Sequence, residues 1–178
     1  VPERAPAYYA LLHEWMLGAG SSAFGMRYLS VLLAAATIAA FIAVARSLLG
    51  SGPAILAGAS AAISPFLIYY GQEVREYQLL LLLALLEIRL LASLARRSAF
   101  GWRWIVYVAL LALSAYVHYY ALFLFPALLI APLFLSTSRA IFWRNALALT
   151  CGGALFLPWF LPRLTTLATY RLFTAGNL

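Results

Sequence analysis

The segment from Ser64 to Tyr77 places polar and ionisable side chains between two long apolar runs, in the order Gln72, Glu73, Arg75 and Glu76. Charged side chains at a membrane boundary, between two apolar runs, usually have a function. A carboxylate in this setting could take a proton, bind a sugar hydroxyl or ligate a divalent metal, and a guanidinium could bind a phosphate. The segment therefore predicts a site for a polar, anionic ligand.

Arg75 is predicted to lie in the first turn of a helix, where the macrodipole makes a cation unfavourable. An anion should compensate for this. The guanidinium and the free N–H groups of the helix start could together hold a phosphate. The alternative is that Arg75 pairs with Glu73, with Glu76 or with a lipid headgroup.

Glu73 is the candidate catalytic carboxylate and the candidate metal ligand. If the helix begins early, Glu73, Glu76 and Tyr77 share one helical face. The simpler alternative is that Glu73 caps the helix and complements its dipole. Function is preferred because a glutamine, an arginine and tyrosines accompany the acid. The substrate contacts predicted in this segment are Gln72, Arg75, Tyr70 and Tyr77.

A second polar turn contains His118 within the aromatic run from Tyr116 to Tyr120. The imidazole could bind a metal, donate to a phosphate or act as a base. An interfacial histidine among aromatic residues serves at least as often as a hydrogen-bonding anchor. His118 and Tyr119 are predicted substrate contacts, and Arg27, at the start of the first long apolar run, is the remaining one.

The composition predicts an integral membrane protein, because 66% of the residues are hydrophobic, 10% are charged and the mean hydropathy is +0.95. All twelve basic residues are arginine and all five acids are glutamate. The net charge of +7 is spread among short segments, which disfavours nucleic acid binding. The sequence has no glycine-rich phosphate loop, zinc-spaced cysteines or nucleophile elbow, so soluble-enzyme chemistry is not indicated.

The predicted fold class is all-α, a polytopic transmembrane helix bundle of about six spans with a short N-terminal interfacial helix. That first helix, Pro6 to Leu17, is too short to cross about 30 Å of hydrocarbon. Pro65 should kink the second span, and Ser136 to Asn145 is predicted to be a polar connection. The predicted spans are Met26 to Leu49, Ala54 to Tyr70, Tyr77 to Ala95, Trp104 to Tyr120, Ala121 to Leu135 and Ala146 to Leu161.

Three regions follow from this pattern: the end of an outer loop with the interfacial helix (1–25), the bundle (26–163) and the start of an outer-face segment (164–178). The first residues lack an initiator Met or a signal peptide, so we expect an internal fragment of a longer protein. Alternate loops differ in charge. By the positive-inside rule, the arginine-rich loops without acids face the cytoplasm, which places Glu73 and His118 outside. Those loops carry Arg46, Arg96, Arg97, Arg103, Arg139 and Arg144.

Parts of the chain resemble the GT-C membrane glycosyltransferases, in the branch of the dolichyl-phosphate-mannose protein mannosyltransferases and the bacterial aminoarabinose transferases of lipid A. Residues 4–9 are similar to a His-Pro-Pro-Leu-Tyr-Tyr run, although Arg4 and Ala5 replace His-Pro, and residues 24–30 are similar to Phe-Ala-Leu-Arg-Leu-Pro-Ser. The strongest likeness is that of residues 64–77 to Ser-Pro followed by Tyr-Tyr-Ser-Gln-Glu-X-Arg-X-Tyr. Residues 118–120 are similar to a later Thr-His-Tyr-Tyr.

The resemblance implies an inverting enzyme of the bacterial inner membrane that transfers a sugar from a polyprenyl-phosphate donor. The acceptor would be a lipid, protein or glycan at the outer face of the bilayer. Glu73 would be the acidic residue of the second outer loop, and Arg75 would meet the carrier phosphate. The main catalytic acid of such enzymes belongs to the first outer loop, which would lie upstream of Val1. The cofactor stays unknown, a divalent metal being possible.

Two other functions are compatible with the sequence. One is a transporter or flippase-like protein whose outer cluster binds a lipid or solute. The other is a noncatalytic scaffold in which Glu73 and Arg75 neutralise each other. Glu87 and Arg89 lie deeper, but residues two positions apart do not face each other on a helix, so we expect Glu87 to pair across the bundle. Because the other polar residues gather at one surface, an interfacial enzyme is favoured.

Overall fold

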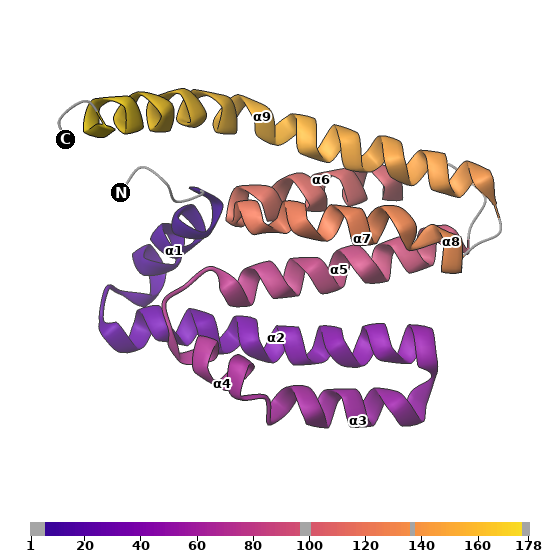
Figure 1. Ribbon diagram of the computed structural model, residues 1–178. Helices are drawn as coiled ribbons and strands as arrows, with labels where there is room; N and C mark the ends of the chain where they lie inside the picture. Colours follow the sequence, from indigo (N-terminus) through magenta and orange to yellow (C-terminus); the bar gives the residue numbers. More distant parts are fainter. Residues whose placement is uncertain (1–5, 97–100, 136–137, 176–178) are drawn as a thin grey trace.

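The computed structural model describes residues 6–96, 101–135 and 138–175, with side chains up to Arg163, and no β-strand occurs in these ranges. Figure 1 shows the longer helices side by side with roughly parallel axes, so the turns between them gather at two ends of a bundle. The predicted all-α class is confirmed.

Helix α1 (Pro6–Ala19) folds back on the start of α2 (Ala23–Leu49). The Ser22 side chain accepts a hydrogen bond from the Gly25 N–H at 3.0 Å, which caps the first turn of α2. The Trp15 indole N–H donates to the Gly25 carbonyl at 2.8 Å. Tyr8, which is fully buried, packs in a cluster with Leu83 and Val117, and this contact holds α1 against the bundle.

The second apolar run is broken into α3 (Ser51–Ala62) and α4 (Pro65–Gln72), which are bent by 51° relative to each other. Pro65 has no N–H to donate and forces Ser64 into an extended conformation, so the helix cannot continue through the pair. The predicted kink at Pro65 is confirmed. The Gln78 amide donates to the Leu67 carbonyl at 2.8 Å and fastens α4 to the next helix.

The predicted third span coincides with α5 (Tyr77–Ala95). The core of the second half contains buried residues of α5, α6 and α9, among them Leu91, Leu111 and Leu149. The remaining elements are α6 (Trp102–Val117), the 3-10 helix η1 (Tyr119–Leu124), α7 (Phe125–Ile130), α8 (Pro132–Leu135) and α9 (Arg139–Ala175).

Asn145 corrects one prediction, because the segment interpreted as a polar connection enters α9 at Arg139. Asn145 is fully buried. Its amide N–H donates to the Leu128 carbonyl at 2.8 Å, and its oxygen accepts from the Tyr107 hydroxyl at 3.1 Å. A polar side chain that reads as a loop residue is instead a satisfied hydrogen-bonding centre between helices.

Each of the six predicted apolar segments falls on helical structure. Among the described residues, three helices are long and apolar enough to cross a membrane by themselves, namely α2, α5 and the Arg139–Arg163 part of α9. The bent pair α3 and α4 makes a fourth when it is counted as one span, and α6 and Tyr119–Leu135 are shorter apolar helices. Helix α9 runs past residue 163 to Ala175, so the proposed region boundary there does not fall at a helix end.

Glu87 lies in the middle of α5 with 1% of its surface exposed. Within the ranges described above, it forms no ion pair and its Oε1 has no hydrogen-bond partner. The Glu87 side chain is instead hydrogen-bonded to Ser114 of α6, so it pairs across the bundle as expected, with a hydroxyl as its partner.

Candidate functional site

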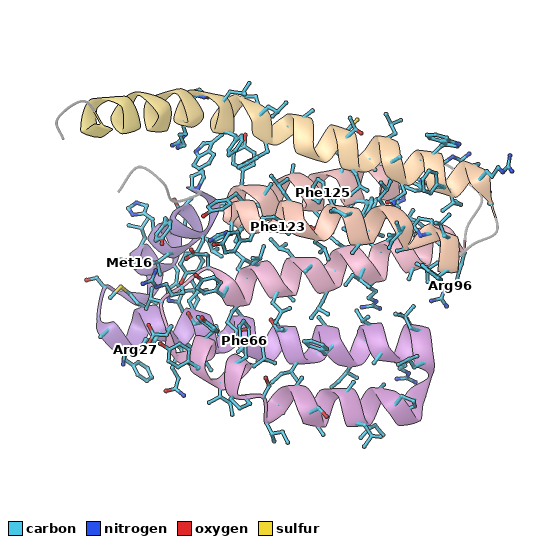
Figure 2. All side chains as sticks on the ribbon, viewed as in Figure 1. Met16, Arg27, Phe66, Arg96, Phe123 and Phe125 are labelled. Carbon is cyan, nitrogen blue, oxygen red and sulfur yellow. The ribbon has the colours of Figure 1, made fainter. Side chains whose placement is uncertain are left out.

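The predicted site residues gather at one end of the bundle. That end contains α1, α4, the start of α5 and the turn from α6 into η1 (Figure 1). Figure 2 shows Arg27 and Phe66 near this end and Arg96 at the opposite one. The Arg96 guanidinium donates to the Ser47 carbonyl at 2.8 Å, which joins two of the arginine-rich turns. The two sets of loops that differ in charge thus lie at opposite ends.

The turn between α4 and α5 is tied to α2 through its backbone. The Glu73 carbonyl accepts hydrogen bonds from the Ser30 hydroxyl at 2.7 Å and from the Arg75 N–H at 2.9 Å. Glu73 itself is extended, with φ −94° and ψ 141°, and α5 begins only at Tyr77. Because these bonds hold the chain off a helical path, Glu76 takes the N-cap position of α5.

This geometry corrects two predictions. Arg75 precedes α5 and does not lie in its first turn. Glu73, Glu76 and Tyr77 do not share a helical face, and Glu73 does not cap α5. The sequence could not reveal this, since the interruption depends on Ser30, a residue of another helix.

Arg75 and Gln72 are exposed, whereas Glu73 and Tyr77 are half-buried. Among the residues that the structure describes, no ion pair joins Arg75 to Glu73 or Glu76. The alternative in which Arg75 is neutralised by a neighbouring glutamate therefore has no support in this geometry. The guanidinium is accessible to a ligand.

Sequence reasoning did not assign a role to Glu76. The structure shows that this side chain is only 7% exposed. Its Oε1 lies 3.7 Å from His118 Nε2, which is ion-pair distance but longer than a hydrogen bond. Its Oε2 accepts a hydrogen bond from the Tyr9 hydroxyl at 3.4 Å. One carboxylate thus links α1, the start of α5 and the turn after α6. A glutamate directly before a long apolar helix, with a histidine in another turn at the same end, was the available signal.

His118 follows α6 and caps η1. Its Nδ1 accepts a hydrogen bond from the Tyr120 N–H at 3.1 Å, so in the neutral ring we assign the proton to Nε2, which faces Glu76. Burial lowers the pKa of His118, and the nearby Glu76 carboxylate opposes that shift. With Nδ1 engaged, the geometry favours the hydrogen-bonding anchor over a free base or metal ligand.

Aromatic rings connect the predicted contacts across three elements. The ring centroids of Tyr70 and Tyr77 are 4.7 Å apart, those of Tyr77 and His118 are 5.9 Å apart, and those of His118 and Tyr119 are 4.7 Å apart. These four side chains are therefore brought together. Arg27 is exposed at the same end, but no hydrogen bond or ion pair links it to them in the described ranges.

A metal site built from this chain alone is not evident. In residues 6–96, 101–135 and 138–163, no three side chains of histidine, cysteine, aspartate or glutamate come close enough to hold a metal ion. We derive no metal-dependent step from these residues.

A family model described as dolichyl-phosphate-mannose-protein mannosyltransferase matches residues 3–165, which include the α4–α5 turn and His118. No curated protein and no solved structure matches the chain significantly.

Proposed function

The chain belongs to the dolichyl-phosphate-mannose-protein mannosyltransferase family, and we propose that it transfers a sugar from a polyprenyl-phosphate-linked donor to an acceptor. The transfer would take place at the outer face of the membrane that the protein spans. Family membership indicates a membrane glycosyltransferase in general. The proposal adds the donor, an acceptor that is a lipid, protein or glycan, and the side of the membrane on which the site lies.

The observation that carries the proposal is the accessible guanidinium of Arg75 at the end of an apolar bundle. A lipid-linked donor needs hydrocarbon for its tail and a cation at the interface for its phosphate. The apolar outer surfaces of the helices suit the tail. Arg75 suits the phosphate, because a guanidinium fork matches phosphate oxygens and no glutamate nearby occupies it.

In the proposed reaction, an acceptor hydroxyl attacks the anomeric carbon of the donor sugar from the face opposite the phosphate. The new carbon–oxygen bond forms as the bond to the phosphate oxygen breaks, so the anomeric configuration inverts. The polyprenyl phosphate leaves with the electron pair of that bond, and Arg75 stabilises its charge. Half-buried Glu73 is the proposed base that takes the proton of the acceptor hydroxyl as the new bond forms.

The aromatic rings between α4 and η1 give the sugar a surface to lie on. Tyr70, Tyr77, His118 and Tyr119 follow one another at the same end as Arg75. We assign them to sugar binding, with Gln72 and Arg27 as further polar groups near the interface.

The test is sugar transfer by the whole protein in lipid nanodiscs, with a defined polyprenyl-phosphate sugar as donor. Removing a charge-assisted bond to phosphate should lower kcat/KM about tenfold or more in Arg75→Ala. Arg46→Ala is the matched control. Arg46 is also an exposed arginine, but it lies in the last turn of α2, at the end of the bundle opposite to Arg75. We expect Arg46→Ala to leave transfer unchanged.

Glu73→Gln should lower kcat while the donor KM stays near the wild-type value, because the acid is proposed to act on the acceptor. Glu14→Gln, at an exposed glutamate of α1, is its control. Normal expression with unchanged transfer in both Arg75→Ala and Glu73→Gln would refute the function proposed for this end of the bundle.

A further inference from the structure

Glu76 fills a position that the Gln-Glu-X-Arg-X-Tyr pattern leaves open, yet it is the most enclosed ionisable side chain of the α4–α5 turn. Its carboxylate has one oxygen toward His118 and the other toward the Tyr9 hydroxyl. Both neighbours can donate a hydrogen to it. A buried carboxylate between two donors from other elements is suited to fixing the position of its own chain segment.

His118 can act only as a donor toward Glu76. Its Nδ1 is occupied by the Tyr120 N–H, which leaves Nε2–H as the group that faces the carboxylate. The same ring therefore anchors η1 with one nitrogen and approaches the α4–α5 turn with the other. This arrangement couples two turns that are distant in the sequence.

The other side of the turn is held by backbone. Ser30 donates to the Glu73 carbonyl at 2.7 Å, and the Arg75 N–H donates to the same oxygen at 2.9 Å. Arg75 thus lies between two attachments, the carbonyl of Glu73 on one side and the side chain of Glu76 on the other. The Arg75 side chain is exposed. These two attachments therefore set the position and direction in which this side chain leaves the backbone.

We propose that Glu76 is a positioning residue whose carboxylate, hydrogen-bonded to Tyr9 and facing His118 Nε2 at 3.7 Å, fixes the α4–α5 turn so that Arg75 presents its guanidinium to the donor phosphate. The inference rests on the proposed function, since Arg75 is taken to bind that phosphate. Glu76 itself does not touch the substrate in this assignment.

A kinetic test separates positioning from a general loss of stability. Glu76→Ala should raise the donor KM about tenfold, the size expected when a charge-assisted phosphate contact is misplaced, with a smaller change in kcat. Glu76→Gln keeps the shape: its amide oxygen can face the His118 Nε2–H, and its NH2 can donate to the Tyr9 hydroxyl oxygen, so KM should return nearly to the wild-type value. An unchanged donor KM in Glu76→Ala would overturn the proposal.

Two substitutions of His118 test the same contact with Glu76 left intact, should Glu76→Ala fold poorly. His118→Asn places an oxygen near the position of Nδ1 and can keep the Tyr120 cap, but it is too short to reach Glu76. His118→Gln places an N–H near the position of Nε2 and can keep the approach to Glu76. Because both substitutions alter a ring assigned to sugar binding, their readout is the mobility of a spin label at position 75 without substrate. This mobility should rise in His118→Asn and stay near the wild-type value in His118→Gln, and the reverse order would contradict the inference.

A spin label at Arg75→Cys, in a background that includes Cys151→Ser, reports the order of the turn without any catalysis. Glu76→Ala and His118→Asn should increase the mobility of this label, and a control label at Arg46→Cys should not respond. Unchanged mobility at position 75 would refute the positioning role whatever the activity. Increased mobility, together with normal transfer in Arg75→Ala, would instead refute the function proposed for Arg75 and leave the attachment of the turn standing.

Discussion

Gly152 and Gly153 are neighbours on α9, and only the first lies too close to another helix to accept a methyl group. A Cβ at position 152 would lie 2.7 Å from Leu111 Cβ on α6, whereas at position 153 the nearest atom would be Phe125 Cε2 at 3.7 Å. Because Leu111 Cβ is bonded to the backbone, no rotamer change can move it away. Gly152→Ala must therefore separate α6 from α9 by about 1 Å, since carbon atoms pack at about 3.5–4.0 Å.

The two substitutions share every effect except this clash. Each replaces a helical glycine by alanine, which favours the helix by roughly 1 kcal/mol, so this gain cancels in the comparison. Overpacking costs about 1–3 kcal/mol, and we expect Gly152→Ala to be less stable than Gly153→Ala by that amount. The measurement is reversible unfolding in mixed detergent micelles, followed by circular dichroism. Equal free energies of unfolding for the two variants would show that α9 does not pack on α6 as described.

Further predictions concern buried polar groups and pH. Asn145→Ala leaves a carbonyl and a tyrosine hydroxyl without their partner, so the same unfolding assay should show a loss of about 1–3 kcal/mol; a loss near zero would contradict the buried network. Gln78→Leu removes the hydrogen bond from the side-chain amide to the Leu67 carbonyl, so hydrogen exchange should become faster in α4 and stay unchanged in α3. Equal protection of α4 in the variant and the wild type would count against this attachment. The pKa of folded His118 lies below its ordinary value of 6.5, so the folded state binds this proton less readily than the unfolded state. Its contribution to stability should be constant above about pH 6.5 and be lost as the pH falls through the folded pKa, and His118→Asn should flatten that acidic decline; an unaltered decline would assign it to another group.

Long apolar runs could be predicted from the sequence because hydrophobic length and helix-breaking residues are local signals. Tyr77 to Ala95 was placed at its observed bounds, and the break before Pro65 follows from the missing N–H of proline. The six-span interpretation located helical structure correctly. It could not show that η1, α7 and α8 divide one apolar segment into short pieces.

The gathering of the candidate site residues at one end of the bundle was predicted, but their arrangement relative to one another was not. Which residues lie at one end of the bundle follows from the order of the helices, so Tyr70, Tyr77, His118 and Tyr119 were brought together as expected. The sequence predicts Arg75 inside α5, but the observed turn depends on a hydrogen bond from Ser30. Because Ser30 is far away in sequence, no local signal marks this turn.

The importance of Glu76 was missed for the same reason. Its burial depends on the contacts with Tyr9 and His118, which belong to two other elements. No pattern within the α4–α5 segment distinguishes an exposed glutamate from one that is enclosed by residues elsewhere in the chain.

Photochemical labelling with a polyprenyl-phosphate sugar that carries a reactive group beside its phosphate tests the donor site most directly. In nanodiscs, the labelled peptides should map to the α4–α5 turn around Arg75 and to the aromatic turn around His118. Competition by unlabelled donor should remove this labelling, and Arg75→Ala should weaken it. Competable labelling at the opposite end, beside Arg46 or Arg96, would show that the donor phosphate binds elsewhere.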